Sequence, residues 1–130
     1  MPDSKIKICI FVPYFCHPSE TFIVDSTRLN SKSFDVSAAA FEFSSKSLKQ
    51  LAPHVKTKKI KKNKQMLMDY FSNFDAIHIH HLNNLRELPL EVLQNNKVYV
   101  TCHGEDVFLY GKDPLYRWQL RKKIKAVTQF

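Results

Sequence analysis

Glycine is scarce in this sequence, which contains only Gly104 and Gly111 among its 130 residues. The stretch that follows the first apolar run, residues 14–21, contains no glycine at all. Such a stretch cannot wrap a pyrophosphate, because the backbone approaches phosphate groups closely only where glycines remove the side chains. The sequence therefore argues against dinucleotide-binding and P-loop nucleotide sites after the first predicted strand.

Long apolar runs are also absent. No run approaches the ~20 residues that a membrane-spanning helix needs, and the longest candidate, residues 6–15, is interrupted by Lys7 and Pro13. The residues that follow Met1 lack the basic, apolar and small-residue sections of a secretion signal. We therefore expect the chain to stay in the cytoplasm.

Only three cysteines are present, and none of them forms a Cys-x-x-Cys pair. An odd number cannot close a disulfide framework, which agrees with a reducing compartment. Cys9 and Cys102 lie in apolar, strand-like runs and are expected to be reduced and buried. Cys16 follows a predicted strand and is expected to be more exposed.

The formal net charge of +8 comes from two blocks without acids, residues 56–64 and 117–125. Such runs usually form a solvated surface. For the first block the alternative is contact with an anionic membrane, at the inner membrane face, through its six lysines: Lys56, Lys58, Lys59, Lys61, Lys62 and Lys64. We expect no nucleic-acid partner, because no aromatic residues interleave with the lysines as stacking platforms.

Short apolar runs alternate with segments of helical spacing. Residues 6–12 form a β-branched run typical of a strand buried on both faces of a parallel sheet. Further strands are expected at residues 34–41, 76–80 and 98–102, with a weak edge strand at 55–60. Helices are expected at 22–29 after the N-cap Ser19, at 44–51, at 66–74, from Pro89 and from Asp113-Pro114.

This alternation implies right-handed βαβ crossovers and an α/β fold. We expect residues 1–130 to form a single three-layer αβα Rossmann-like domain with a mostly parallel sheet. Residues 125–130 resemble the opening of one more strand. A natural domain seldom ends inside an element, so we expect that the domain is truncated after Phe130.

Three polar clusters follow the predicted strands, where ligands bind in an open parallel sheet. Residues 14–21 place Ser19, Glu20 and Thr21 at a helix N-terminus, which attracts anions. In residues 78–81 the strand alternation places His78 and His80 on one face. The third cluster combines a tight turn with an imidazole and two carboxylates, in His103, Gly104, Glu105 and Asp106.

These clusters allow three interpretations. The imidazoles could hydrogen-bond neighbouring loops and serve only the structure. His78, His80, His103 and Asp106 could hold zinc, although no known ligand spacing is met in full, so no metal is expected. The third interpretation, which we favour, is a site for a sugar or phosphate to which the imidazoles donate hydrogen bonds.

At these residues the sequence resembles the N-terminal halves of GT-B glycosyltransferases of the family 4 type, particularly the branch that makes bacterial exopolysaccharide and capsule. In that branch a strand ending in Phe-Pro precedes Ser-Glu-Thr-Phe-Ile, and here Val12-Pro13 precedes residues 19–23. A strand closing in His-x-His is matched at residues 78–80, and Thr-x-His-Gly-x-Asp is matched at residues 101–106. The family's final strand, Val-x-Ser-x-Phe, would fall at residues 127–130, with Gln129 in place of serine.

The resemblance implies a retaining transferase that moves a sugar from a nucleotide-sugar donor to a glycan or lipid-linked acceptor, without a covalent intermediate, essential metal or other cofactor. The matched motif carries over His103 as the catalytic residue near the donor sugar. His80 and His78 would line the acceptor side, while Glu20 and Thr21 would border the donor phosphates. Helix amides and cations would stabilise the departing diphosphate.

The same resemblance implies a second Rossmann-like domain, which holds the donor and an acidic Glu-x7-Glu motif. Such enzymes need two or three times this length, at ~100 to 200 residues per domain. One domain alone offers half a cleft and cannot exclude water from the reaction. We therefore expect the 130-residue chain to be inactive alone, with a donor-binding domain supplied by further sequence or by a second chain.

Two other classes of function stay open. One is a non-enzymatic α/β module that binds a partner, although a receiver-type domain would need paired acids where the first strand is followed by Pro13 and Tyr14. The other is a metal-dependent hydrolase that uses the histidines and Asp106. The donor sugar, the acceptor and the oligomeric state do not follow from the sequence.

Overall fold

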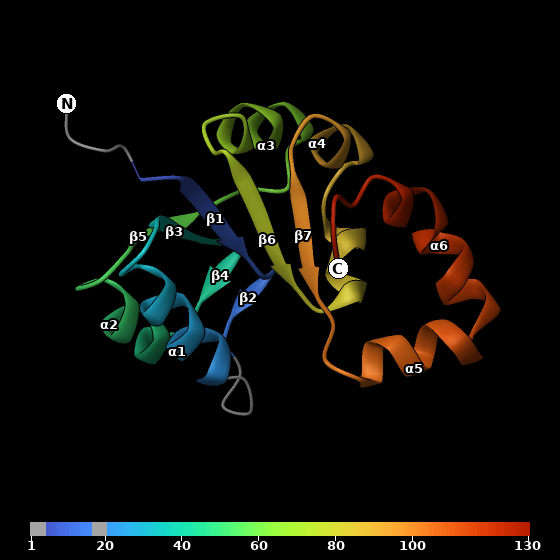
Figure 1. Ribbon diagram of the computed structural model, residues 1–130, viewed down its shortest axis with the longest axis horizontal. Coiled ribbons are helices and arrows are strands. Elements are labelled where there is room, and N and C mark those ends of the chain that lie inside the picture. The colour runs from blue at the N-terminus through green and yellow to red at the C-terminus, as the bar shows by residue number, and fades with distance from the viewer. Residues whose placement is uncertain (1–4, 17–20) are drawn as a thin grey trace.

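The computed structural model describes residues 5–16 and 21–130, which form an α/β fold (Figure 1). The central sheet has five parallel strands in the order β5-β3-β1-β6-β7. Their bounds are Lys7–Phe11 for β1, Asp35–Ala40 for β3, Lys56–Lys59 for β5, Ala76–His80 for β6 and Val98–Thr101 for β7. The expected Rossmann-like, mostly parallel sheet is thereby confirmed.

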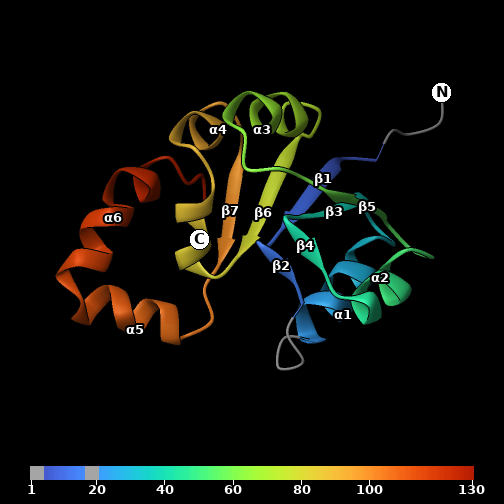
Figure 2. The same ribbon diagram turned by 180° about the vertical axis from the view of Figure 1, so that it is seen from behind.

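Helices cover both faces of the sheet (Figures 1 and 2). One face carries α1 (Thr21–Asn30) and α2 (Ser45–Leu51). The other carries α3 (Lys64–Phe71), α4 (Leu90–Gln94), α6 (Pro114–Lys125) and the 3-10 helix η2 (Leu82–Glu87), and α5 (Glu105–Lys112) leads into α6. No helix among the described residues is both long and apolar enough to cross a bilayer.

The strand order reverses direction between β1 and β6. From β1 the chain moves outward through β3 to β5, then returns to place β6 on the other side of β1, with β7 beyond it. The carboxyl ends of β1 and β6 therefore part at the middle of the sheet, which is where open α/β sheets bind ligands. This topology determines where the candidate site lies.

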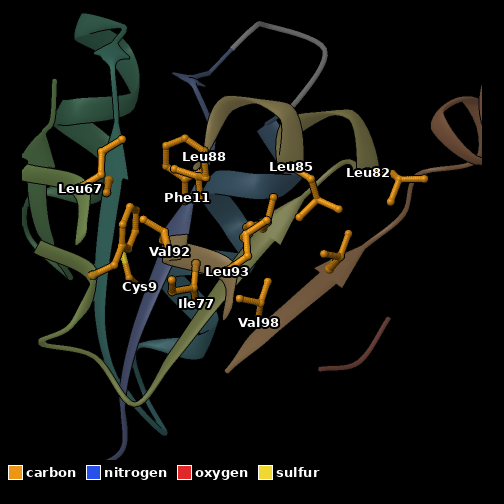
Figure 3. Close-up of a cluster of buried hydrophobic side chains, with 14 of the residues drawn as sticks. Cys9, Phe11, Leu67, Ile77, Leu82, Leu85, Leu88, Val92, Leu93 and Val98 are labelled. Carbon is orange, nitrogen blue, oxygen red and sulfur yellow. The ribbon is translucent and has the colours of Figure 1, made fainter. Parts of the chain in front are cut away.

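Apolar side chains pack in two clusters, one on each face of the sheet. The larger cluster lies between β1, β6, β7 and the helices α3, α4, η2 and α6, and Figure 3 shows most of its centre. Phe11 of β1 packs edge-to-face against Phe71 of α3, with ring centroids 5.9 Å apart, and against Phe41 at 5.5 Å. The smaller cluster joins β1 and β3 to Ile23, Val24 and Leu51.

Within residues 5–16 and 21–130, a side chain caps the first turn of three helices. Ser44 accepts the N–H of Ser47 at α2, Asn63 accepts that of Met66 at α3, and Asp113 accepts those of Leu115 and Tyr116 at α6. Each cap satisfies an amide that has no partner within its helix. Pro114 follows its cap at the start of α6, as expected, whereas Pro89 precedes α4 and occupies its N-cap position.

The structure differs from the sequence predictions in several elements. A second, two-stranded sheet, which was not expected, pairs β2 (Tyr14–Phe15) with β4 (Glu42–Phe43), and β4 lies just beyond the expected strand 34–41, which is confirmed as β3. Residues 125–130 were expected to open a further strand; α6 runs to Lys125, and at Gln129 the chain begins to pair in parallel with Tyr99 of β7. The α5 and η2 helices were not expected.

The cysteines also differ in part from expectation. Cys9 is buried in β1, as expected, and burial raises the pKa of its thiol to about 12. Cys16 is buried in the smaller core, where the paired β2 and β4 strands cover this part of the chain. Cys102 lies past the end of β7 and is only half-buried. Cys9 and Cys102 are free thiols.

Replacing Phe71 by alanine tests the larger core. The side chain is fully buried against Phe11, so Phe71→Ala should lower the free energy of unfolding by about 3–5 kcal/mol. Phe130→Ala, at a ring that is 58% exposed, is the matched control and should change it by less than about 0.5 kcal/mol. Urea denaturation of both variants measures the difference, and equal losses would contradict the packing described.

Candidate functional site

A cleft of about 570 Å³ opens at the carboxyl ends of β1, β6 and β7. Its walls come from the segment after β1, from η2 after β6, and from α5 and α6 after β7. The lining residues are Val12, Pro13, Tyr14, His81, Asn83, Asn84, Arg86, Glu87, His103, Glu105, Asp106, Leu109 and Tyr116. The cleft therefore occupies the position at which the strand order reverses.

Four imidazoles gather beside this cleft. His78 and His80 lie on the same face of β6, as the strand alternation predicts, with ring centroids 4.4 Å apart. Nδ1 of His80 and Nε2 of His103 are 3.2 Å apart and share a hydrogen bond across the ends of β6 and β7. The ring of His81 lies 4.3 Å from that of His103. The two histidine motifs, far apart in the sequence, thus form one cluster.

His80 is the most deeply buried member of the cluster. Only 3% of its surface is exposed, and its Nε2 has no hydrogen-bond partner among the described residues. Burial, together with the neighbouring imidazoles of His78, His103 and His81, lowers the pKa of His80 to about 3. Burial and His103 also lower the pKa of His78, whose Nε2 lies 2.6 Å from Oγ1 of Thr101. Both rings are therefore neutral near pH 7.

Asp106 ties the loops after β6 and β7 together. Its Oδ2 accepts the N–H of Leu82 at 2.6 Å, and its Oδ1 accepts those of His103 and Val107, both at 2.9 Å. Burial would raise the pKa of this carboxyl, but the three backbone donors outweigh burial and lower it. The ionised carboxylate thus fixes the backbone of His103 relative to the start of η2.

Two residues of the site have positive φ angles. Gly104 has φ +89° at the N-cap of α5, a conformation that glycine adopts without steric cost. His81 has φ +70° between β6 and η2, and for a residue with a Cβ atom this conformation is strained. Its N–H donates to the carbonyl of Thr101, which holds the turn in place. Strained backbone of this kind concentrates at functional sites.

The polar wall on η2 is held in place by neighbouring groups. Nη1 of Arg86 donates to the side-chain oxygen of Gln119 at 3.0 Å, and the guanidinium lies 5.3 Å from the ring centroid of Tyr116. Nδ2 of Asn84 donates to the carbonyl of His80 at 2.7 Å. This wall was not expected from the sequence, although a run of Asn, Asn and Arg soon after a buried strand could have indicated it.

The other residues predicted for the site are distributed as follows. Glu105 lines the cleft and, like Gly104, is exposed. Thr21 is the exposed first residue of α1, and the ring of the next residue, Phe22, lies 4.9 Å from that of His103. The start of α1 therefore reaches the imidazole cluster. Ser19 and Glu20 lie outside the described residues.

The side chains of the imidazole cluster, as the structure describes them, are not arranged around a common metal ion. Within residues 5–16 and 21–130, no group of three His, Cys, Asp or Glu side chains is arranged to hold a metal ion. Nδ1 of His80 and Nε2 of His103 face each other, and both carboxylate oxygens of Asp106 accept backbone N–H groups. The arrangement is suited to hydrogen-bonding a polar ligand at the cleft.

No side chain of the first lysine block lines the cleft, although Lys62 pairs with Glu87 of its wall. Lys56, Lys58 and Lys59 belong to β5, an edge strand whose lysines discourage pairing with other chains. Lys61 and Lys62 follow it, and Lys64 begins α3. Three of the six pair with acids: Lys59 with Glu42, Lys62 with Glu87 and Lys64 with Glu91. The charge of this block is therefore partly neutralised within the fold.

Comparison with known proteins leaves the family open: no family model and no curated protein matches the chain.

The pH dependence of stability tests the burial of His80. In the unfolded chain His80 takes up a proton below about pH 6.5, whereas the folded form resists protonation down to about pH 3. The unfolded state therefore binds more protons in this window, and stability falls as the pH falls. Between pH 7 and pH 5 the wild type should lose about 2 kcal/mol more than His80→Asn. Denaturation curves at both pH values measure this difference, and equal losses would contradict a neutral, buried His80.

Replacing Asp106 by asparagine tests the link between the two loops. An amide has one acceptor oxygen for the three N–H groups, so Asp106→Asn should lower the free energy of unfolding by about 2–4 kcal/mol. Glu105→Gln removes an exposed carboxylate from the neighbouring position and should change stability by less than about 0.5 kcal/mol. Equal stability of the two variants in thermal denaturation would show that Asp106 does not link the loops.

Proposed function

We propose that this chain is the acceptor-binding domain of a retaining glycosyltransferase of the GT-B type, which builds polysaccharide or a lipid-linked glycan. The observation that carries the proposal is the imidazole cluster at the cleft where the strand order reverses. Saccharides need many directional hydrogen bonds, and the cleft offers imidazole, amide, guanidinium and carboxylate groups within one space.

The proposed reaction transfers a sugar from a nucleotide-sugar donor to an acceptor hydroxyl. The bond between the anomeric carbon and the donor phosphate oxygen breaks, and the acceptor oxygen forms a bond to that carbon on the same face of the ring. The proton of the acceptor hydroxyl moves to the departing phosphate oxygen, so the products are the extended acceptor and a nucleoside diphosphate. No oxidant, reductant or metal is required for the atoms to balance.

His103 is the proposed catalytic residue on this chain. Its ring borders the cleft and is flanked by His80, His81 and Phe22, which restrict its orientation. An imidazole in this position would donate a hydrogen bond to a hydroxyl of the donor sugar and hold the anomeric carbon near the acceptor. Asp106 acts as a positioning residue, because it fixes the backbone N–H of His103.

The donor would be held by a second α/β domain facing this cleft. A nucleotide-sugar needs groups for its base and diphosphate, and closure of a second domain would exclude water from the reacting atoms. The start of α1, beside His103, would border the donor phosphates. The membrane contact expected of the first lysine block is not part of this proposal, because three of its six lysines pair with acids within the fold.

The two alternatives are less well supported. A metal-dependent hydrolase would need His80, His103 and Asp106 to converge on one ion, whereas Nδ1 of His80 shares a hydrogen bond with Nε2 of His103 and both oxygens of Asp106 accept backbone N–H groups. A partner-binding module would not need neutral, buried imidazoles beside a strained backbone turn. Neither alternative accounts for the cleft and the imidazole cluster together.

Saccharide binding tests the proposal directly. The purified chain is screened against an array of bacterial capsule and exopolysaccharide fragments, and the dissociation constant of the best fragment is measured by calorimetry. His103→Ala should weaken binding about tenfold, because it removes a hydrogen bond at the cleft. His54→Ala is the control, since His54 is exposed and lies in the turn before β5. Binding of no saccharide, or an equal effect of both substitutions, would contradict the proposal.

Transfer activity tests the need for a second domain. The 130-residue chain, mixed with a panel of nucleotide sugars and the saccharide it binds, should release no nucleoside diphosphate above the rate without protein. A coupled assay for the released diphosphate measures this. Turnover by the chain alone would refute the requirement for a separate donor-binding domain.

A further inference from the structure

The outer face of α6 combines large apolar side chains with cations. Leu115 is 62% exposed and Trp118 is 69% exposed, although residues of these types are ordinarily covered. On the same helix Arg121, Lys122 and Lys125 are exposed. We call these five residues the α6 outer face. The neighbouring helix α5 adds the exposed side chains of Val107 and Phe108.

The helical repeat places the α6 outer face opposite the side that packs on the protein. Tyr116 and Leu120, four residues apart, are buried against the larger core. Leu115, Trp118, Lys122 and Lys125 follow one another at intervals of three and four residues and so form a different stripe. Both views of the fold place α6 at the outside of the molecule, beyond η2 and α4 (Figures 1 and 2).

The cations of this face are not neutralised within the described part of the chain. None of Arg121, Lys122 and Lys125 forms an ion pair within 4.0 Å there. Three lysines of the first block, by contrast, pair with glutamates. Each of the two surfaces therefore keeps three cations without an ion pair among the described residues, but only the α6 outer face also carries exposed apolar side chains, which the β5 strand lacks.

We propose that the α6 outer face binds the surface of an anionic lipid bilayer. A helix that lies in a membrane interface places tryptophan, leucine and phenylalanine at the boundary between headgroups and acyl chains, and its lysines and arginines against anionic headgroups. The α6 outer face offers both groups in the adjacent turns of one helix. The complementary charge selects an anionic bilayer over a protein groove, which would need matching acids.

The same helices connect this surface with the cleft. Leu109 of α5 and Tyr116 of α6 line the cleft, while Phe108 and Leu115, the residues next to them in the chain, are exposed outward. A bilayer bound at the α6 outer face would therefore lie beside one wall of the cleft. We infer that the acceptor is a glycan attached to a membrane lipid. This last step rests on the proposed function, whereas bilayer binding does not.

Trp118 provides the probe, because it is the only tryptophan in the chain. Its emission is recorded while the 130-residue protein is titrated with vesicles of phosphatidylglycerol and phosphatidylcholine, in low salt. The emission should shift to shorter wavelength and be quenched by lipids brominated on their acyl chains. Pure phosphatidylcholine vesicles should give no shift, and added salt should reverse the effect, because screening weakens contacts with headgroups.

Matched variants test whether vesicle binding needs the α6 outer face or only the positive charge of the protein. Changing Arg121, Lys122 and Lys125 together to glutamine should reduce vesicle binding by about tenfold or more in co-sedimentation. The control variant changes Lys56, Lys58 and Lys61 to glutamine, which removes the same charge at and beyond β5, and should bind nearly as well as the wild type. A second pair compares Leu115→Ser with Leu29→Ser, at a leucine that is 64% exposed on α1, and only the first should weaken binding.

Each outcome supports or overturns the proposal. An unchanged Trp118 emission with anionic vesicles overturns it, as does equal loss of binding in the two triple variants. A shift that depends on protein concentration without lipid would show that a second copy covers this face, and would also overturn it. If vesicles bind but saccharides do not, bilayer docking stands while the proposed transferase function fails. If saccharides bind but vesicles do not, the transferase function stands and bilayer docking fails.

Discussion

The buried carboxylate of Asp106 is the interaction on which the site depends. It accepts three backbone N–H groups from two loops that leave neighbouring strands, and it thereby sets the distance between the end of β6 and the turn after β7. The ladder between β6 and β7 pairs His80 with Thr101, and the carboxylate holds the backbone of His103, two residues beyond Thr101, in position relative to that ladder. The carboxylate also satisfies amides that would otherwise be unpaired at the start of η2 and α5.

The burial of the imidazole cluster determines the charge at its centre. Because burial holds His80 neutral, the cluster contains hydrogen-bonding groups and no compact positive charge at its centre. The cleft beside it is lined by Arg86 and by the carboxylates of Glu87, Glu105 and Asp106. A neutral centre bordered by carboxylates, amides and one guanidinium is suited to hydrogen-bonding the hydroxyl groups of a ligand.

Much of the fold could be predicted from the sequence, because its signals are local. The β-branched run of β1, the alternation in β6 and the capping residue Asp113 each determine their element within a few residues. The α5 helix was missed because Asp106 appeared as a candidate ligand, although Gly104 followed by two acids is also a helix start. The small β2–β4 sheet could not be predicted, since two-residue strands pair only when tertiary packing brings them together.

The candidate site could be predicted only in part. His78, His80 and His103 were expected at the ends of strands. The wall formed by Asn84 and Arg86 could not be predicted, because it depends on how η2 folds back over the cleft. The role of Asp106 could not be foreseen, because its partner Leu82 is distant in sequence. The charge of the folded surface was the hardest property to predict from the sequence. Ion pairs such as that of Lys62 with Glu87 neutralise part of a basic block, and they form only when the chain folds.

The proposed function depends on one claim, that the imidazole cluster and the cleft beside it form one ligand site. Nitrogen-15 spectra of the histidine rings, recorded before and after saturation with the bound saccharide, test it most directly. We expect the ring signals of His81 and His103 to shift while those of His54 stay unchanged. A saccharide that binds with comparable affinity but leaves His81 and His103 unperturbed would contradict the claim.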